Sequence, residues 1–132
     1  MAKYAYPAVF EKDNAGSFNV SFPDIPCCYT CGDTLAEAIE MAEDALALML
    51  YHYEEEQRPI PVVSPIEQLQ CQKESFISYI ACDTLGYRKR YNNKAVKKTL
   101  SIPEWLNELA MDANINFSQV LQDALKQQLQ TN

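Results

Sequence analysis

The sequence predicts an α+β protein built from two parts. Over residues 1–83, short runs of alternating apolar and polar residues stand on either side of one long amphipathic helix, a pattern typical of a sheet covered by a helix. Over residues 95–132, one short alternating run is followed by two helical patterns. A basic segment over residues 84–94, compatible with a short helix over its first eight positions, joins the two parts. The length of 132 residues suits one ordinary domain or two very small ones.

The first two predicted strands form a hairpin. Apolar and aromatic side chains occupy alternate positions over residues 3–11 and again over residues 17–22. The intervening residues 12–16, Lys-Asp-Asn-Ala-Gly, favour a turn because Asp, Asn and Gly tolerate left-handed backbone. A third short strand is predicted over residues 28–31 and a last one over residues 76–82. The order of elements is therefore β-β-β-α-β, ending near residue 83.

The helix between these strands is predicted to begin after Thr34 and to run to about Tyr53. Thr34 and Glu37 have the spacing of a capping box, in which each side chain bonds to the other's backbone N–H. The acidic residues lie away from the apolar face. Residues expected on the face that covers the sheet are Leu35, Ala38, Ile39, Ala42, Leu46, Met49 and Tyr53.

The tail is predicted to contain a strand over residues 96–102 and two helices, the second capped by Asn116 with Gln119 in the reciprocal position. Pro103 suits the first turn of the first helix. A strand with no partner exposes unpaired backbone groups, and a unit of about 35 residues is too small to fold readily alone. We therefore expect the tail of one chain to pair with the same tail of a second copy, as an antiparallel ribbon over four helices.

Charge is distributed unevenly. Residues 1–57 contain eleven acidic side chains and two lysines, whereas residues 88–98 contain six basic side chains and no acid. This asymmetry suggests two partners, one basic and one anionic. Glu40, Glu43 and Asp44 on the long helix are the candidate surface for a basic protein partner; the alternative is that they form an ordinary solvated helix face.

The tail presents the strongest pattern for nucleic-acid binding. In the predicted strand, Lys97, Thr99 and Ser101 point to the side opposite the apolar residues, and a two-stranded ribbon fits the major groove of DNA. The N-terminus of the last helix, at Asn116, Phe117 and Ser118, offers backbone N–H groups to a phosphate. The alternative is a solvated strand face on a dimerisation module.

Other chemistries have weaker support in the sequence. The five cysteines are odd in number and irregularly spaced, which favours reduced thiols in a cytosolic protein over a disulfide framework or a zinc site. His52 is a lone histidine. Asp24, Asp33 and Asp83 could be imagined as a nuclease metal cluster, but two of them fall in a loop and at a helix start. We expect no enzyme activity, cofactor, metal or membrane span.

Two stretches resemble known families. VKKTLSIPEWLNELAMDANINFSQVLQDAL resembles the ribbon-helix-helix repressors of the Arc type, although Phe117 stands where arginine is common in that family. YPAVFEKDNAGSFNVSFPDIPCCYTCGDTLAEAIEMAEDAL resembles the HicB antitoxin domain. The resemblance implies a partial ribonuclease H-like domain without catalysis over residues 1–83, and a ribbon-helix-helix domain over residues 95–132. It further implies a HicA-like mRNA-cleaving toxin as partner, and repression of the chain's own operon by a homodimer or tetramer.

Three functional hypotheses follow from the sequence. The first is an antitoxin that covers its toxin and also binds operator DNA. The second is a free-standing repressor whose N-terminal domain senses a ligand or oligomerises. The third is a nuclease of ribonuclease H type. An adjacent gene for a small basic protein favours the first hypothesis over the second.

Overall fold

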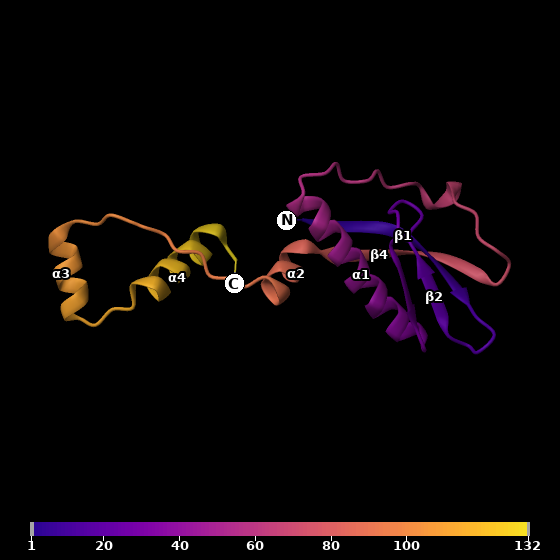
Figure 1. The fold of residues 1–132 in the computed structure, drawn as a ribbon, viewed down its shortest axis with the longest axis horizontal. Coiled ribbons are helices and arrows are strands. Elements are labelled where there is room, and N and C mark those ends of the chain that lie inside the picture. The colour runs from indigo at the N-terminus through magenta and orange to yellow at the C-terminus, as the bar shows by residue number, and fades with distance from the viewer. Residues whose placement is uncertain (1, 132) are drawn as a thin grey trace. The chain divides into compact units, whose positions relative to one another are not determined.

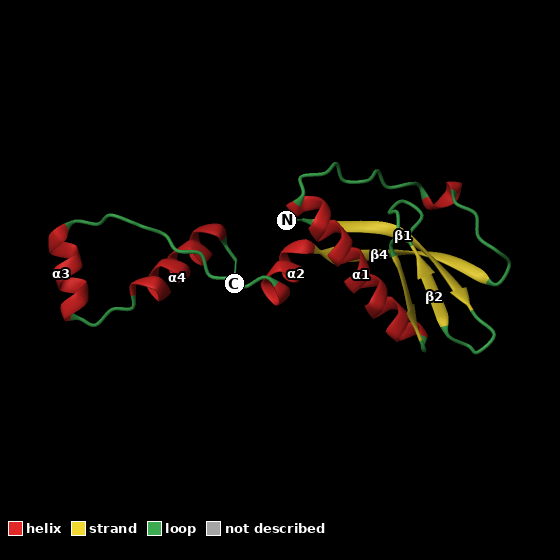
Figure 2. Ribbon diagram, in the orientation of Figure 1, coloured by secondary structure: helices red, strands yellow, loops and turns green. Residues whose placement is uncertain are grey.

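The computed structural model describes residues 2–131. The chain divides between residues 94 and 95 into two compact units, here called unit 1 and unit 2, and each is described by itself. As predicted, the class is α+β: Figures 1 and 2 show one antiparallel sheet in unit 1 and helices in both units. Among the described residues, no helix is both long and apolar enough to cross a membrane.

The sheet of unit 1 has four antiparallel strands in the order β3-β2-β1-β4. Their bounds are β1 Lys3–Lys12, β2 Phe18–Ser21, β3 Tyr29–Gly32 and β4 Ser75–Asp83. The predicted β-β-β-α-β order is thus confirmed. β1 pairs with β4 from Lys3, opposite Asp83, to Glu11, opposite Ser75, so the first and last strands of the sheet in sequence order lie side by side.

The hairpin turn between β1 and β2 is held by its own side chains. The Asp13 carboxylate accepts hydrogen bonds from the backbone N–H of Ala15 and of Ser17, both at 2.9 Å. Gly16 has φ +88°, a left-handed conformation that glycine adopts without a steric penalty. The turn predicted over residues 12–16 is therefore present.

Helix α1, Leu35–Glu55, lies across one face of the sheet (Figure 1). The Thr34 hydroxyl accepts the Glu37 backbone N–H at 3.1 Å and starts the helix as predicted. The predicted face was partly wrong, because Leu35 is 43% exposed at the first helical position, whereas Ala47 and Leu50 are buried. The core consists of small α1 residues against aromatic sheet residues: Ala38, Ala42, Leu46 and Leu50 with Tyr6, Ala8, Phe10 and Val20.

Gly32 is required where β3 meets α1. A Cβ at this position would lie 2.4 Å from the backbone nitrogen of Ala38 and 2.6 Å from its Cα. Backbone atoms of a packed helix cannot move aside as a side-chain end can, so the close approach of strand and helix depends on the missing side chain.

Unit 1 continues through a long loop and a short helix. The loop from residue 56 to residue 74 contains a 3-10 turn at Ile66–Gln68. The Asp24 carboxylate fixes this loop by accepting hydrogen bonds from the Ser64 backbone N–H at 2.9 Å and from the Ser64 hydroxyl at 2.5 Å. After β4 the chain enters α2, Thr84–Tyr91, a helix that the sequence pattern allowed.

Unit 2 contains α3, Glu104–Asp112, and α4, Phe117–Leu129. Both predicted helices are present, and Pro103 directly precedes the first residue of α3. In the connection between the two helices, Asn114 has a left-handed backbone with φ 55°. The strand predicted over residues 96–102 is not formed in the single chain, which has no secondary structure from residue 92 to 103. That prediction placed the strand's partner in a second copy, so the pairing itself stays a prediction.

Candidate functional site

The acidic surface predicted on α1 is solvent-accessible. Glu40, Glu43 and Asp44 are all exposed, on the side of the helix away from the sheet core. The three residues do not share the same surroundings, however. Glu43 and Asp44 line a cleft bounded by α1, α2 and the ends of β1 and β4, whereas Glu40 does not line it.

Helix α2 is held against α1 by Arg88. The Arg88 guanidinium donates to Glu54 at 3.1 Å and to Glu55, and its Cζ lies 4.6 Å from the ring centroid of Tyr51. Only 16% of the Arg88 side chain and 10% of the Glu54 side chain are exposed. Screening by water is therefore limited, and the ion pair is stronger than one on an open surface.

Glu54 joins three elements of unit 1. One of its carboxylate oxygens accepts hydrogen bonds from the Tyr4 hydroxyl at 2.8 Å and the Thr84 hydroxyl at 2.9 Å, and the other accepts Arg88. Burial by itself raises the pKa of Glu54, but these and further hydrogen bonds to the charged form outweigh it and lower the pKa to about 2. Conversely, burial and the bond to Glu54 raise the pKa of Tyr4 to about 12.

Tyrosines form one side of the junction between α1 and α2. The rings of Tyr51 and Tyr87 have centroids 5.2 Å apart, and those of Tyr87 and Tyr91 are 4.7 Å apart. Arg90 lies over the Tyr91 ring at 5.5 Å. Such contacts between a guanidinium and an aromatic face are each worth about 0.5–2 kcal/mol, depending on desolvation.

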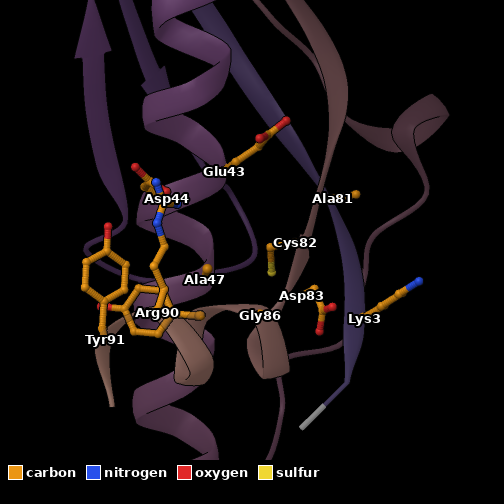
Figure 3. A pocket seen from close by; sticks show the side chains of 11 residues that line it. Lys3, Glu43, Asp44, Ala47, Ala81, Cys82, Asp83, Gly86, Arg90 and Tyr91 are labelled. Carbon is orange, nitrogen blue, oxygen red and sulfur yellow. The ribbon is translucent and has the colours of Figure 1, made fainter. Parts of the chain in front are cut away.

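The cleft itself has a volume of about 490 Å³, within the range of about 300–1,000 Å³ for clefts that hold ligands. Figure 3 shows Arg90 extending toward Asp44, while Lys3 points away from that pair. The remaining lining residues are Glu43, Ala47, Ala81, Cys82, Asp83, Gly86, Tyr87 and Tyr91.

The residues predicted to bind DNA are all exposed. Lys97, Thr99 and Ser101 lie in the segment without secondary structure that precedes α3. At the start of α4, the Asn116 side chain accepts the backbone N–H of Gln119 at 3.1 Å, as the capping pattern predicted. Phe117 and Ser118 follow it as the first two helical residues, and Phe117 is 43% exposed.

The three aspartates considered as a metal cluster have separate structural roles. Asp24 fixes the loop at Ser64, Asp33 accepts the Ser17 hydroxyl at 3.4 Å, and Asp83 caps α2 by accepting the Leu85 N–H at 3.0 Å. Within residues 2–131, no three His, Cys, Asp or Glu side chains group closely enough to hold a metal ion.

The cysteines in the described part of the chain are free thiols. Cys28 and Cys82 are buried, and burial raises their pKa values to about 11 and about 12 respectively. Neutral, buried thiols are poor nucleophiles and poor metal ligands. Cys82 therefore serves as a small apolar residue at the base of the cleft.

Sequence reasoning missed the junction between α1 and α2. Arg88 and Arg90 were counted as part of a basic segment for DNA, yet Arg88 is held within unit 1 by Glu54 and Glu55. The available signal was the run Tyr-Arg-Lys-Arg-Tyr over residues 87–91, in which each arginine stands next to a tyrosine, since guanidinium groups pack on aromatic rings.

A family model and two curated proteins that match this chain are all described as HicB antitoxins or HicB-like antitoxins. The model of the family described as HicB-like antitoxin of bacterial toxin-antitoxin system matches residues 6–125. Antitoxin HicB 1 of Photorhabdus laumondii is 46% identical over 63 residues, 48% of this chain and 41% of that protein. Antitoxin HicB of Escherichia coli K12 is 43% identical over 61 residues, 46% and 44% of the two chains. This chain thus spans less than half the length of these two curated relatives.

Solved structures resemble nearly the whole chain. A chain of the toxin-antitoxin complex from Streptococcus pneumoniae superposes with a TM-score of 0.63 at 28% identity, over 96% of this chain and 99% of that one. The antitoxin HicB of Burkholderia pseudomallei has a TM-score of 0.54 at 20% identity, over 92% and 96% of the two chains, a likeness of fold alone.

Proposed function

Because this chain belongs to the family of HicB-like antitoxins, we propose that it neutralises a small basic HicA-like toxin that cleaves mRNA and represses its own operon. Unit 1 covers the toxin's active surface, and unit 2 binds operator DNA as a ribbon-helix-helix homodimer. The chain acts by binding and has no enzyme activity of its own. The family match and the likeness to a chain of the Streptococcus pneumoniae toxin-antitoxin complex support the first role.

The charge of unit 1 is the observation that favours it as the toxin-binding part. Eleven acids against two lysines over residues 1–57 give a strongly negative surface, and Glu40, Glu43 and Asp44 are exposed on one helix. Complementary charge speeds the encounter with a basic protein and orients it.

Charge reversal on α1 tests this role. The variant Glu40→Lys, Glu43→Lys, Asp44→Lys is titrated with the basic protein encoded beside the gene, and its affinity is compared with that of the unmodified chain. A control variant makes the same charge change at exposed acids elsewhere in unit 1: Glu11→Lys, Glu67→Lys and Glu74→Lys. Weaker binding by the first variant only supports the α1 surface; equal affinities contradict it.

Unit 2 lacks a core of its own, which favours a homodimer. None of the residues described in unit 2 is buried, and twelve of its large apolar side chains are at least 41% exposed. Burying one such side chain fully contributes about 1.5–3 kcal/mol, so association of two copies gains what the single copy cannot. The side chains concerned are Val96, Leu100, Ile102, Trp105, Leu106, Leu109, Met111, Ile115, Phe117, Val120, Leu125 and Leu129.

Pairing of residues 96–102 across the dimer would also satisfy the backbone groups of that segment and create a ribbon. On one face of this ribbon, Lys97, Thr99 and Ser101 would meet base edges in the major groove. The N-terminus of α4, at Asn116, would contact a flanking phosphate. A gel-shift titration with the chain's own promoter tests this role, and failure to bind that DNA as a dimer would refute it.

A further inference from the structure

We propose that the cleft between α1 and α2 is the binding site for an arginine side chain of the basic protein partner, because its lining combines the carboxylates of Glu43 and Asp44 with the tyrosines of α2. This inference rests on the proposed toxin-binding role of unit 1 and identifies where in unit 1 the recognition takes place.

The carboxylates of the cleft are available to a ligand. Among residues 2–131, the side-chain carboxylates of Glu43 and Asp44 have no hydrogen bond, and no ion pair within 4.0 Å. Other acids of unit 1 are already engaged: Glu54 and Glu55 hold Arg88, and Asp83 caps α2. A cation that enters the cleft therefore gains partners that the folded chain does not already use.

The electrostatic field in the cleft disfavours anions. Burial raises the pKa of Cys82, and the nearby carboxylates of Asp83, Glu54 and Glu43 raise it further. Burial also raises the pKa of Tyr87, with added contributions from Tyr91, Tyr51 and Asp44. Each group thus has a lining carboxylate near it, Glu43 for Cys82 and Asp44 for Tyr87.

The tyrosines make arginine a better ligand than lysine. A guanidinium is planar and weakly hydrated, so it can lie on an aromatic face while it donates in its own plane to a carboxylate. Arg88 already shows this geometry, since it lies over Tyr51 and donates to Glu54 and Glu55. Arg90 lies over Tyr91. In Figure 3 Arg90 extends toward Asp44, so it is the internal cation that an incoming arginine would displace.

The small residues of the lining leave room for such a side chain. Ala47, Ala81 and Gly86 are among the lining residues, and the volume of about 490 Å³ admits a side chain together with part of its backbone. A site of this shape selects for a long side chain with a charged end.

The test uses the full-length chain and a blocked Gly-Arg-Gly peptide, with Gly-citrulline-Gly as the neutral peptide of the same shape. Binding is followed by the NMR amide shifts. The arginine peptide should shift Ala47, Gly86 and Tyr91 saturably, and the citrulline peptide should bind at least about tenfold more weakly, a difference of 1.4 kcal/mol. The variant Glu43→Gln, Asp44→Asn should lose about the same factor.

Two further variants test whether peptide binding changes in the expected direction. Arg90→Ala removes the competing cation and should bind the arginine peptide more tightly, whereas Glu67→Gln and Glu74→Gln, outside the cleft, should leave binding unchanged. Equal binding of the two peptides, or unchanged binding by the Glu43→Gln, Asp44→Asn variant, would overturn the proposal. Thermal unfolding midpoints establish that each variant is folded.

The toxin itself separates this inference from the proposed function. Weaker toxin binding by the Glu43→Gln, Asp44→Asn variant, with normal binding by the Glu67→Gln, Glu74→Gln control, supports the cleft as the toxin's site. Equal toxin binding by both variants overturns the cleft while the antitoxin role stands. If the unmodified chain fails to bind the toxin, the proposed function is wrong, whatever the peptide shows.

Discussion

Replacing Glu54 by glutamine removes the negative charge on which β1, α1 and α2 converge, and we expect it to destabilise unit 1. The pKa of Glu54 falls from 4.5 to about 2 on folding. A shift of this size, at 1.36 kcal/mol per unit, corresponds to about 3 kcal/mol of stability. Because 10% of the side chain is exposed, solvent screening reduces this figure only modestly, to about 2–3 kcal/mol.

The sign of the pH dependence follows from the lowered pKa. The carboxylate is favoured in the folded state, so its contribution is complete above about pH 5 and is lost as the pH falls toward about 2. The Glu54→Gln variant has no group to titrate at this position. Its stability should therefore start lower at neutral pH and decline less between about pH 5 and pH 2.

The chain carries separate spectroscopic reporters for this assay. All eight tyrosines lie in unit 1, and the one tryptophan, Trp105, lies in unit 2. Urea unfolding of unit 1 is followed by tyrosine near-UV circular dichroism at several pH values. Glu56→Gln is the control, because Glu56 pairs with Arg58 at the surface, with 55% of its side chain exposed. Parallel stability–pH curves for Glu54→Gln and the unmodified chain would refute the role assigned to Glu54.

Three further predictions concern other parts of the chain. Gly32→Ala should destabilise unit 1 by more than about 2 kcal/mol in the same urea assay, because the added Cβ would lie 2.4 Å from the Ala38 nitrogen; an unchanged midpoint would show that the strand moves freely. Asn116→Ala should cost about 1 kcal/mol in the unfolding of unit 2, read from Trp105 fluorescence, because α4 loses its cap; Gln130→Ala, past the end of α4, should have a smaller effect. Lys97→Ala and Thr99→Ala should each weaken operator binding by about 1–3 kcal/mol in a gel-shift series without altering the oligomeric mass; full affinity in both would remove the ribbon from the interface.

Local patterns were sufficient to predict the strands and helices of unit 1 and the two helices of unit 2. The alternation over residues 3–11, the apolar β-rich run over residues 76–82, the Thr34 and Asn116 caps and the helical periods depend on neighbours in sequence, and the structure confirms these elements. Leu35 was misplaced because periodicity alone does not say where a helix first extends beyond the sheet that it covers.

The junction of α1 and α2 could not be predicted in the same way. Glu54 bonds to residues 50, 30 and 34 positions away, at Tyr4, Thr84 and Arg88. Such contacts depend on which strands pair, and the β1–β4 register that brings residue 4 near residue 84 has no local signature. For the same reason the sequence indicated Glu43 and Asp44 as surface acids but did not reveal the cleft that they line.

Pairing of two copies through unit 2 is tested most directly by sedimentation equilibrium of the full-length chain at micromolar concentration. Two chains of 15.0 kDa give 30.0 kDa, and we expect a particle of that mass or a whole multiple of it. Leu109→Lys, at an apolar position that is 60% exposed in the single chain, should lower the mass to that of one chain. A particle of 15.0 kDa from the unmodified chain would contradict the pairing and, with it, the ribbon that is proposed to bind DNA.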